Sequence, residues 1–151
     1  MKKLILLFTL SLAVLLATAQ NTEKRLALII GNAAYQHGGA LKNPVNDANL
    51  MARTLQNLGF DVDKLTNASL RKMQVATATF TNKIKNYDVA LFYYAGHGIQ
   101  VEGRNYLIPV DAKMDNRTMA KFEALDINFV NEAFLQNQDN VNIMVLDACR
   151  N

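Results

Sequence analysis

Two side chains suited to nucleophilic catalysis, His97 and Cys149, each closely follow an apolar run in this chain. Residues 88–95 (DVALFYYA) precede the histidine, and residues 141–146 (VNIMVL) precede the cysteine. Compact apolar runs of this kind are typical of strands buried on both faces of a sheet. The functional crevice of an open α/β sheet lies outside the carboxyl ends of its strands. If the two strands are neighbours, roughly 4.8 Å apart, the two side chains can therefore share one cleft.

A cysteine and a histidine in one cleft can carry out acyl transfer. A free thiol has a pKa near 8.5 and is mostly protonated at pH 7. A nearby imidazole can stabilise the thiolate and later protonate the leaving amine. Because Gly98 lacks a Cβ, its N–H can approach a developing oxyanion, with the Cys149 amide as the second donor. Residue types alone leave an alternative open, in which His97 is a loop residue and Cys149 a buried apolar thiol.

The composition restricts the other possible functions. The chain has 151 residues, enough for one domain, and half of them are hydrophobic. Its single cysteine excludes an internal disulfide and a zinc site built from several cysteines. The net charge is +3, and it falls to +1 (14 basic against 13 acidic residues) without Lys2 and Lys3. Since no basic run exceeds two residues, we expect no nucleic-acid partner.

The first nineteen residues have the pattern of a secretory signal peptide. Lys2 and Lys3 precede an apolar run over residues 4–17, and Ala17 and Ala19 supply the small residues of a cleavage site. We therefore expect cleavage after Ala19, export to the periplasm or the medium, and a mature domain of residues 20–151. The apolar run is shorter than the roughly 18 residues of a spanning helix, so we expect no stable membrane anchor. An uncleaved anchor is the alternative.

The rest of the chain alternates between strand and helix patterns. This alternation predicts an α/β fold, a mostly parallel sheet flanked by helices. Residues 99–110 are expected to form a hairpin, and residues 111–125 a surface connection. The predicted strands cover residues 25–31, 60–65, 88–95 and 141–146, and the predicted helices begin at Asn43, Ser69 and Asp126.

Two motifs resemble the active-site motifs of the caspase-like cysteine peptidases, nearest to their metacaspase-like and bacterial branch. They are residues 93–98 (YYAGHG) and 147–151 (DACRN), and Cys149 follows His97 by 52 residues, close to the roughly 50 of caspases. The resemblance implies a caspase–hemoglobinase fold, a caspase p20 domain, and a Cys–His dyad that cleaves peptide bonds in proteins or peptides. The supporting stretches are residues 25–35 (RLALIIGNAAY), 41–48 (LKNPVNDA) and 105–112 (NYLIPVDA).

The resemblance also has a consequence for specificity. Animal caspases carry Gln two residues before the cysteine, where this chain has Asp147. In metacaspase-like relatives an acid at this position helps to line the P1 pocket, and the acid corresponding to Asp47 joins it. Two carboxylates there would bind Arg or Lys and repel Asp, so we expect cleavage after basic residues. The alternatives are a helix-dipole role for Asp47 and a strand-end cap for Asp147.

Other interpretations remain open at this stage. The chain could be a gingipain-like or legumain-like endopeptidase of the same fold, or a non-catalytic caspase-fold interaction module. The resemblance implies further strands after Cys149, so we expect a domain that is incomplete at its C-terminus. We expect no cofactor, although calcium dependence and the oligomeric state are not determined by the sequence. We expect no catalytic role for His37, and a sheet-packing role for Tyr93 and Tyr94.

Overall fold

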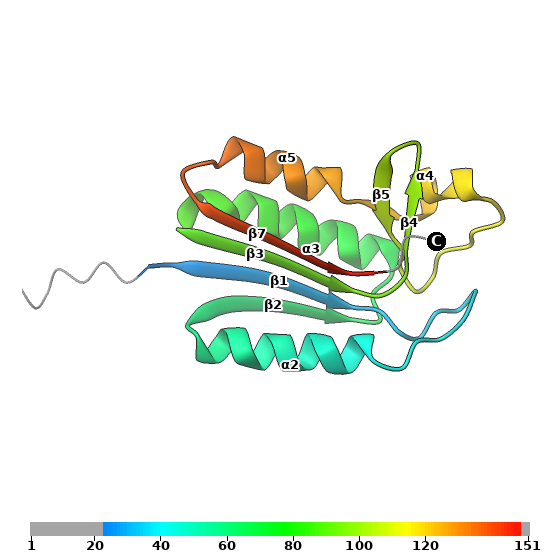
Figure 1. The fold of residues 1–151 in the computed structure, drawn as a ribbon, viewed down its shortest axis with the longest axis horizontal. Helices are drawn as coiled ribbons and strands as arrows, with labels where there is room; N and C mark the ends of the chain where they lie inside the picture. Colours follow the sequence, from blue (N-terminus) through cyan, green and yellow to red (C-terminus); the bar gives the residue numbers. More distant parts are fainter. Residues whose placement is uncertain (1–22, 149–151) are drawn as a thin grey trace, which may run out of the picture.

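The structure is a computed structural model that describes residues 23–148. Four strands form a parallel sheet in the order β2-β1-β3-β7 (Figure 1). This arrangement confirms the α/β fold and the parallel sheet that were predicted from the sequence. The strands are β1 (Arg25–Gly31), β2 (Phe60–Thr66), β3 (Val89–Ala95) and β7 (Val141–Asp147).

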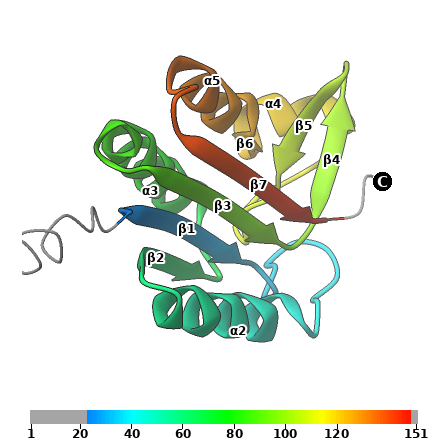
Figure 2. The ribbon, with the colours of Figure 1, turned by 60° about the vertical axis from the view of Figure 1, so that its left-hand side comes forward.

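Helices cover both faces of this sheet, as Figures 1 and 2 show. Helix α2 (Pro44–Asn57) covers one face, and helices α3 (Leu70–Lys83) and α5 (Asn128–Gln136) cover the other. A short 3₁₀ turn, η1 (Ile84–Asn86), follows α3. None of the helices formed by residues 23–148 has the length and hydropathy needed to cross a bilayer.

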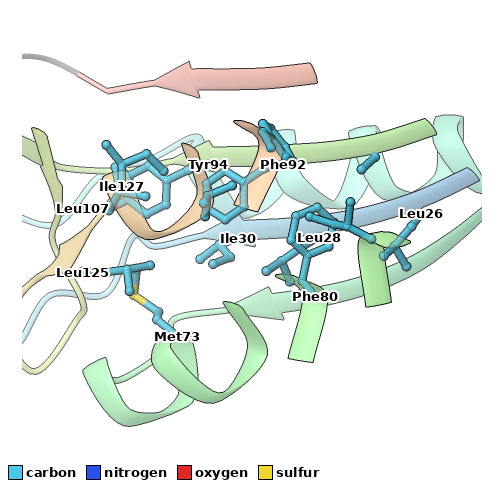
Figure 3. Packing of buried hydrophobic residues seen from close by; sticks show 14 of the residues in the cluster. Leu26, Leu28, Ile30, Met73, Phe80, Phe92, Tyr94, Leu107, Leu125 and Ile127 are labelled. Carbon is cyan, nitrogen blue, oxygen red and sulfur yellow. The ribbon is translucent and has the colours of Figure 1, made fainter. Parts of the chain in front are cut away.

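Alternate residues of β1 and β3 enter two separate apolar clusters. Successive side chains of a strand point to opposite faces, so a strand covered on both sides is apolar throughout. Ile29 and Leu91 pack on the α2 side. Leu28 and Phe92 pack on the α3 and α5 side, where Phe80 of α3 joins them (Figure 3).

The start of α2 is held unusually close to the end of β1. Pro44 occupies the first turn of α2, as predicted, whereas Asn43 makes no side-chain capping bond. A Cβ on Gly31 would lie 2.5 Å from the Pro44 carbonyl oxygen and 2.6 Å from the Ala48 Cβ. Glycine at position 31 is therefore required for this contact. At the other end, Gly59 adopts a φ of 81° immediately after the helix, as expected for a C-terminal cap.

A small antiparallel sheet, in the order β4-β5-β6, lies beside the carboxyl ends of the main strands (Figure 2). The predicted hairpin is confirmed, with its turn at Glu102 and Gly103. The predicted surface connection over residues 111–125 is largely exposed, but it also holds short elements and buries the alanines at 112, 120 and 124. Elements of two to four residues are too short to give a periodic signal. The short elements between β3 and α5 are the hairpin strands β4 (Gly98–Val101) and β5 (Arg104–Leu107), followed by η2 (Arg117–Met119), α4 (Ala120–Glu123) and β6 (Leu125–Asp126).

Strand β7 is more exposed than its apolar sequence predicts. Val141, Ile143 and Val145 are 58%, 36% and 37% exposed. The register with β3 places these side chains on the same face as Tyr93. Helix α2 packs against β2, β1 and β3 on this face, so its cover stops short of β7.

Candidate active site

The register of β3 and β7 relates the two predicted catalytic positions. The strands are parallel neighbours, and every β7 residue carries a number 52 higher than its β3 partner, as in Val89 with Val141. The last pair is Ala95 with Asp147, and the Gly96 N–H donates to the Asp147 carbonyl at 3.2 Å. His97 and Cys149 each follow this last pair by two residues in the sequence. Cys149 itself lies outside the described residues.

The imidazole of His97 is oriented by a main-chain carbonyl. Its Nε2 lies 3.0 Å from the carbonyl oxygen of Gly39, in the loop between β1 and α2. Because a carbonyl oxygen only accepts, Nε2 carries the hydrogen, and Nδ1 of the neutral ring holds the lone pair. The sequence does not reveal this role of Gly39, because no side chain is involved. His37, in the same loop, is exposed.

The main chain of His97 is also bonded on both sides. Its N–H donates to the Tyr35 hydroxyl at 2.7 Å, and its carbonyl accepts from the Tyr94 hydroxyl at 2.7 Å. The rings of Tyr35 and His97 are in contact, with centroids 4.5 Å apart. The predicted packing role of Tyr94 is confirmed, since it is fully buried in the cluster of Figure 3. Its hydroxyl and that of Tyr35 are additional site contacts that sequence reasoning missed.

Gly96 is required where β3 leads into His97. Its φ of 155° lies at the edge of the region that side chains rarely adopt. A Cβ at this position would lie 2.6 Å from the hydroxyl oxygens of both Tyr35 and Tyr94. Glycine therefore allows the two phenols to reach the main chain of the next residue.

A buried amide, Asn32, joins the segments beneath the site. Its N–H donates to the carbonyl of Ala95, at the end of β3, at 2.9 Å. Its side-chain oxygen accepts from the Ala68 N–H at 2.9 Å, and its side-chain nitrogen donates to the Ile108 carbonyl at 3.1 Å. Asn32 is fully buried, so these bonds are shielded from water. One residue, through its main chain and its side chain together, thus connects the segments after β1, β2 and β5 to the end of β3.

The two predicted pocket acids both influence the pKa of Tyr93. This tyrosine is 5% exposed on the α2 side of β3. Burial raises the pKa of the Tyr93 phenol, and the negative charges of Asp147 and Asp47 raise it further. The two carboxylates therefore lie within electrostatic range of one phenol, although they come from β7 and from the first turn of α2. Asp147 is exposed, and Asp47 is half-buried.

A small cavity of about 70 Å³ lies between the β4–β5 hairpin and the end of β7. Gly98 lines it on one side, and Leu146 and Ala148 line it on the other. The structure therefore brings the residue after His97 close to the residue before Cys149. Among residues 23–148, no group of three or more His, Cys, Asp or Glu side chains is arranged to hold a metal ion.

The sheet order, the helices on both faces and the polar residues at the carboxyl ends of β3 and β7 define an α/β domain with its site at that edge. Comparison with protein families then gives the particular family. The caspase domain matches residues 24–151, so this chain belongs to the caspase domain family of peptidases.

Individual relatives agree with this assignment. The chain is 29% identical over 128 residues to human mucosa-associated lymphoid tissue lymphoma translocation protein 1, covering 85% of this chain and 15% of the human protein. It is 26% identical over 137 residues to a paracaspase of Dictyostelium discoideum, covering 87% of this chain and 32% of that protein. The chain thus spans a minor part of both relatives. The assignment to the metacaspase-like branch stays a prediction.

The fold agrees with a solved structure as well. A protein of Geobacter sulfurreducens, known from its crystal structure, superposes with a TM-score of 0.61 at 22% sequence identity. The match covers 83% of this chain and 50% of the bacterial chain. At this identity the similarity concerns the fold alone.

Proposed function

We propose that this domain is a cysteine endopeptidase in which Cys149 is the nucleophile and His97 the general base and acid. The register of β3 and β7 is the observation that carries this proposal, because each of the two residues follows the last paired residue of its strand by two positions in the sequence. The hydrogen bond from Nε2 to Gly39 supports the role of His97, since it leaves the Nδ1 lone pair to take a proton.

The proposed reaction proceeds through an acyl-enzyme. The Cys149 sulfur adds to the scissile carbonyl as its proton passes to His97, and the amides of Gly98 and Cys149 hold the oxyanion. The C–N bond then breaks, and the imidazolium returns its proton to the leaving amine. Water, deprotonated by His97, hydrolyses the thioester and releases the second product.

An activity-based probe tests this proposal directly. A peptidyl acyloxymethyl ketone with arginine at P1 should label the wild-type protein at Cys149, located by mass spectrometry of the digested protein. Labelling should disappear in Cys149→Ala and in His97→Ala, and persist in His37→Ala, which removes the exposed histidine of the neighbouring loop. A folded wild-type protein that resists the probe and hydrolyses no peptide would instead indicate a non-catalytic module.

We further propose that Asp47 and Asp147 select arginine or lysine at P1. The support is that both carboxylates lie within electrostatic range of the Tyr93 phenol, which is on the α2 side of the sheet. A guanidinium can donate hydrogen bonds to both carboxylates, whereas an aspartate side chain would be repelled. Burial keeps the Tyr93 phenol neutral beside them, so it adds no charge at neutral pH.

Neutralising either acid should weaken cleavage after arginine. We expect Asp147→Asn to lower kcat/KM for a P1-Arg peptide by about 10- to 100-fold, the value of one hydrogen bond to a charged group. The ratio of P1-Arg to P1-Gln turnover should fall in parallel. Asp63→Asn is a matched control, because Asp63 lies on the distant strand β2, where it forms an exposed ion pair with Lys83 of α3. Faster turnover of P1-Asp than of P1-Arg peptides by the wild type would contradict the assignment.

We also propose that residues 1–19 direct export and are then removed. The support is the order of basic, apolar and small residues, which lies outside the described part of the structure. Expressed in a bacterial host with its native N-terminus, the exported protein should begin at Gln20. Intact-mass measurement and N-terminal sequencing check this outcome. Recovery of the full-length form in the membrane fraction would indicate the uncleaved anchor instead.

A further inference from the structure

We propose that Tyr35 and Tyr94 are positioning residues that hold the main chain of His97 in a closed ring of hydrogen bonds. The ring runs from the His97 N–H to the Tyr35 hydroxyl, on to the Tyr94 hydroxyl and back to the His97 carbonyl. Its kinetic consequence rests on the proposed function, in which His97 is the base. The ring itself depends only on the contacts of described residues.

Counting hydrogens gives the ring a direction. The carbonyls of His97, at 2.7 Å, and of Ile108, at 2.9 Å, can only accept, so they share the single hydrogen of the Tyr94 hydroxyl, and the shorter contact is the one to His97. In the 3.4 Å contact between the two hydroxyls, Tyr35 is then the donor and Tyr94 the acceptor. Tyr35 in turn accepts from the His97 N–H at 2.7 Å. The contact between the two hydroxyls is the longest of the ring.

Burial keeps the ring intact over the working pH range. Tyr35 is 9% exposed and Tyr94 is fully buried. Burial raises the pKa of the Tyr35 phenol, and it raises that of Tyr94 well above its ordinary value. Both hydroxyls therefore keep their hydrogens at neutral and mildly alkaline pH.

The surroundings leave little room for another arrangement. A Cβ on residue 96 would lie 2.6 Å from both hydroxyl oxygens, so the two hydroxyls fit here because residue 96 is glycine. The Tyr35 ring lies against the imidazole, and Tyr35 belongs to the same loop as Gly39. The loop thus holds His97 at three places: the main-chain N–H, the ring face and Nε2.

The two tyrosines are not equivalent. Tyr35 is the acceptor for the His97 N–H, so a phenylalanine there leaves that part-buried N–H without its partner. The His97 carbonyl, by contrast, also accepts from the Ile108 N–H at 3.0 Å and keeps this bond when the Tyr94 hydroxyl is removed. Tyr35→Phe should therefore disturb His97 more than Tyr94→Phe does.

Nuclear magnetic resonance with ¹⁵N-labelled histidine tests the ring without requiring activity. The chain has two histidines, so exposed His37 serves as an internal reference. In the wild type we expect the neutral His97 ring to be the Nε2–H tautomer and its main-chain amide to exchange slowly. Tyr35→Phe should mix the two tautomers and speed exchange of this amide by about tenfold or more. Tyr87→Phe is the matched control, because it removes a hydroxyl that bonds Asp61 away from His97.

A kinetic arm measures the effect on the proposed reaction. Tyr35→Phe should lower kcat by about 10- to 100-fold, as expected for a misplaced base, with KM changed less than about twofold. Tyr94→Phe should lower kcat by about threefold to tenfold. Tyr87→Phe should match the wild type in both constants.

The two arms separate the ring from the proposed function. If the wild type hydrolyses nothing, the proposed function fails while the resonance experiment still decides on the ring. If Tyr35→Phe folds and leaves the His97 tautomer, amide exchange and kcat as in the wild type, the ring is overturned. If Tyr35→Phe does not fold, Tyr94→Phe decides. That variant removes the partner of the Tyr35 hydroxyl, so exchange of the His97 amide should rise by about twofold or more, and unchanged exchange overturns the proposal.

Discussion

Replacing His97 with alanine is expected to lower kcat/KM for a P1-Arg peptide by about 10⁴-fold or more, the usual cost of losing the base of a catalytic pair. Two steps of the proposed reaction depend on this imidazole. Without it, the thiol stays protonated at neutral pH, and the leaving amine departs without a proton. The imidazole is half-buried and bonds the Gly39 carbonyl, and it does not belong to the apolar core. Its removal should therefore change the free energy of unfolding by less than about 1 kcal/mol.

The control for this prediction is the other histidine. His37 is exposed in the loop that carries Gly39, and His37→Ala should retain wild-type kcat/KM within about twofold. Progress curves with a fluorogenic peptide, together with urea unfolding of each variant, measure both quantities. Retention of a tenth or more of the activity in folded His97→Ala would remove His97 from the mechanism.

The largest loss of stability is expected from Asn32→Ala, at about 3–4 kcal/mol. The change leaves the buried Ala68 N–H without its acceptor and takes one donor from the Ile108 carbonyl. It also empties the volume of a fully buried side chain, which also contacts the Met73 sulfur at 3.4 Å. The bond from the Asn32 N–H to Ala95 belongs to the main chain and survives the substitution.

Chemical denaturation is the measurement for this second prediction. Asn82→Ala is the matched control, because Asn82 is exposed near the end of α3 and should cost less than about 0.5 kcal/mol. The Asn32 side chain also bonds the Ile108 carbonyl, which accepts from the Tyr94 hydroxyl as well, so the variant should lose activity before it unfolds. A destabilisation below about 1 kcal/mol would mean that neighbouring groups replace the lost bonds.

The positions of the main strands could be predicted because strands buried on both faces consist of continuous apolar residues, which are visible in the sequence. The continuous apolar runs at residues 25–31 and 88–95 identify two strands covered on both faces, and both form as predicted. The same reasoning overestimated the burial of β7, whose apolar residues are partly exposed where α2 does not reach. An apolar pattern predicts a strand reliably, but its cover depends on how far a helix extends across the sheet.

Site contacts made by the main chain could not be predicted in this way. Residue types identify His97 as a candidate base, but the carbonyl of Gly39 and the hydroxyl of Tyr35 reach it from a distant loop. Asp47 and Asp147 are 100 residues apart in the sequence, and only the family resemblance predicted that they act together. The structure shows that both lie within electrostatic range of Tyr93. Contacts across such distances depend on tertiary packing, which local patterns do not encode.

The constant offset between β3 and β7 indicates how such a site can vary among related chains. The connection over residues 96–140 contains the β4–β5 hairpin, the 3₁₀ turn η2, strand β6 and the helices α4 and α5. Added length in such a connection costs little free energy, because the entropy of loop closure grows only slowly with the number of residues. A one-residue slip within either strand, in contrast, would turn Tyr93 or Asp147 to the opposite face. Distant homologues should therefore be aligned by counting residues from the last paired position of each strand, and the spacing between histidine and cysteine can be left free.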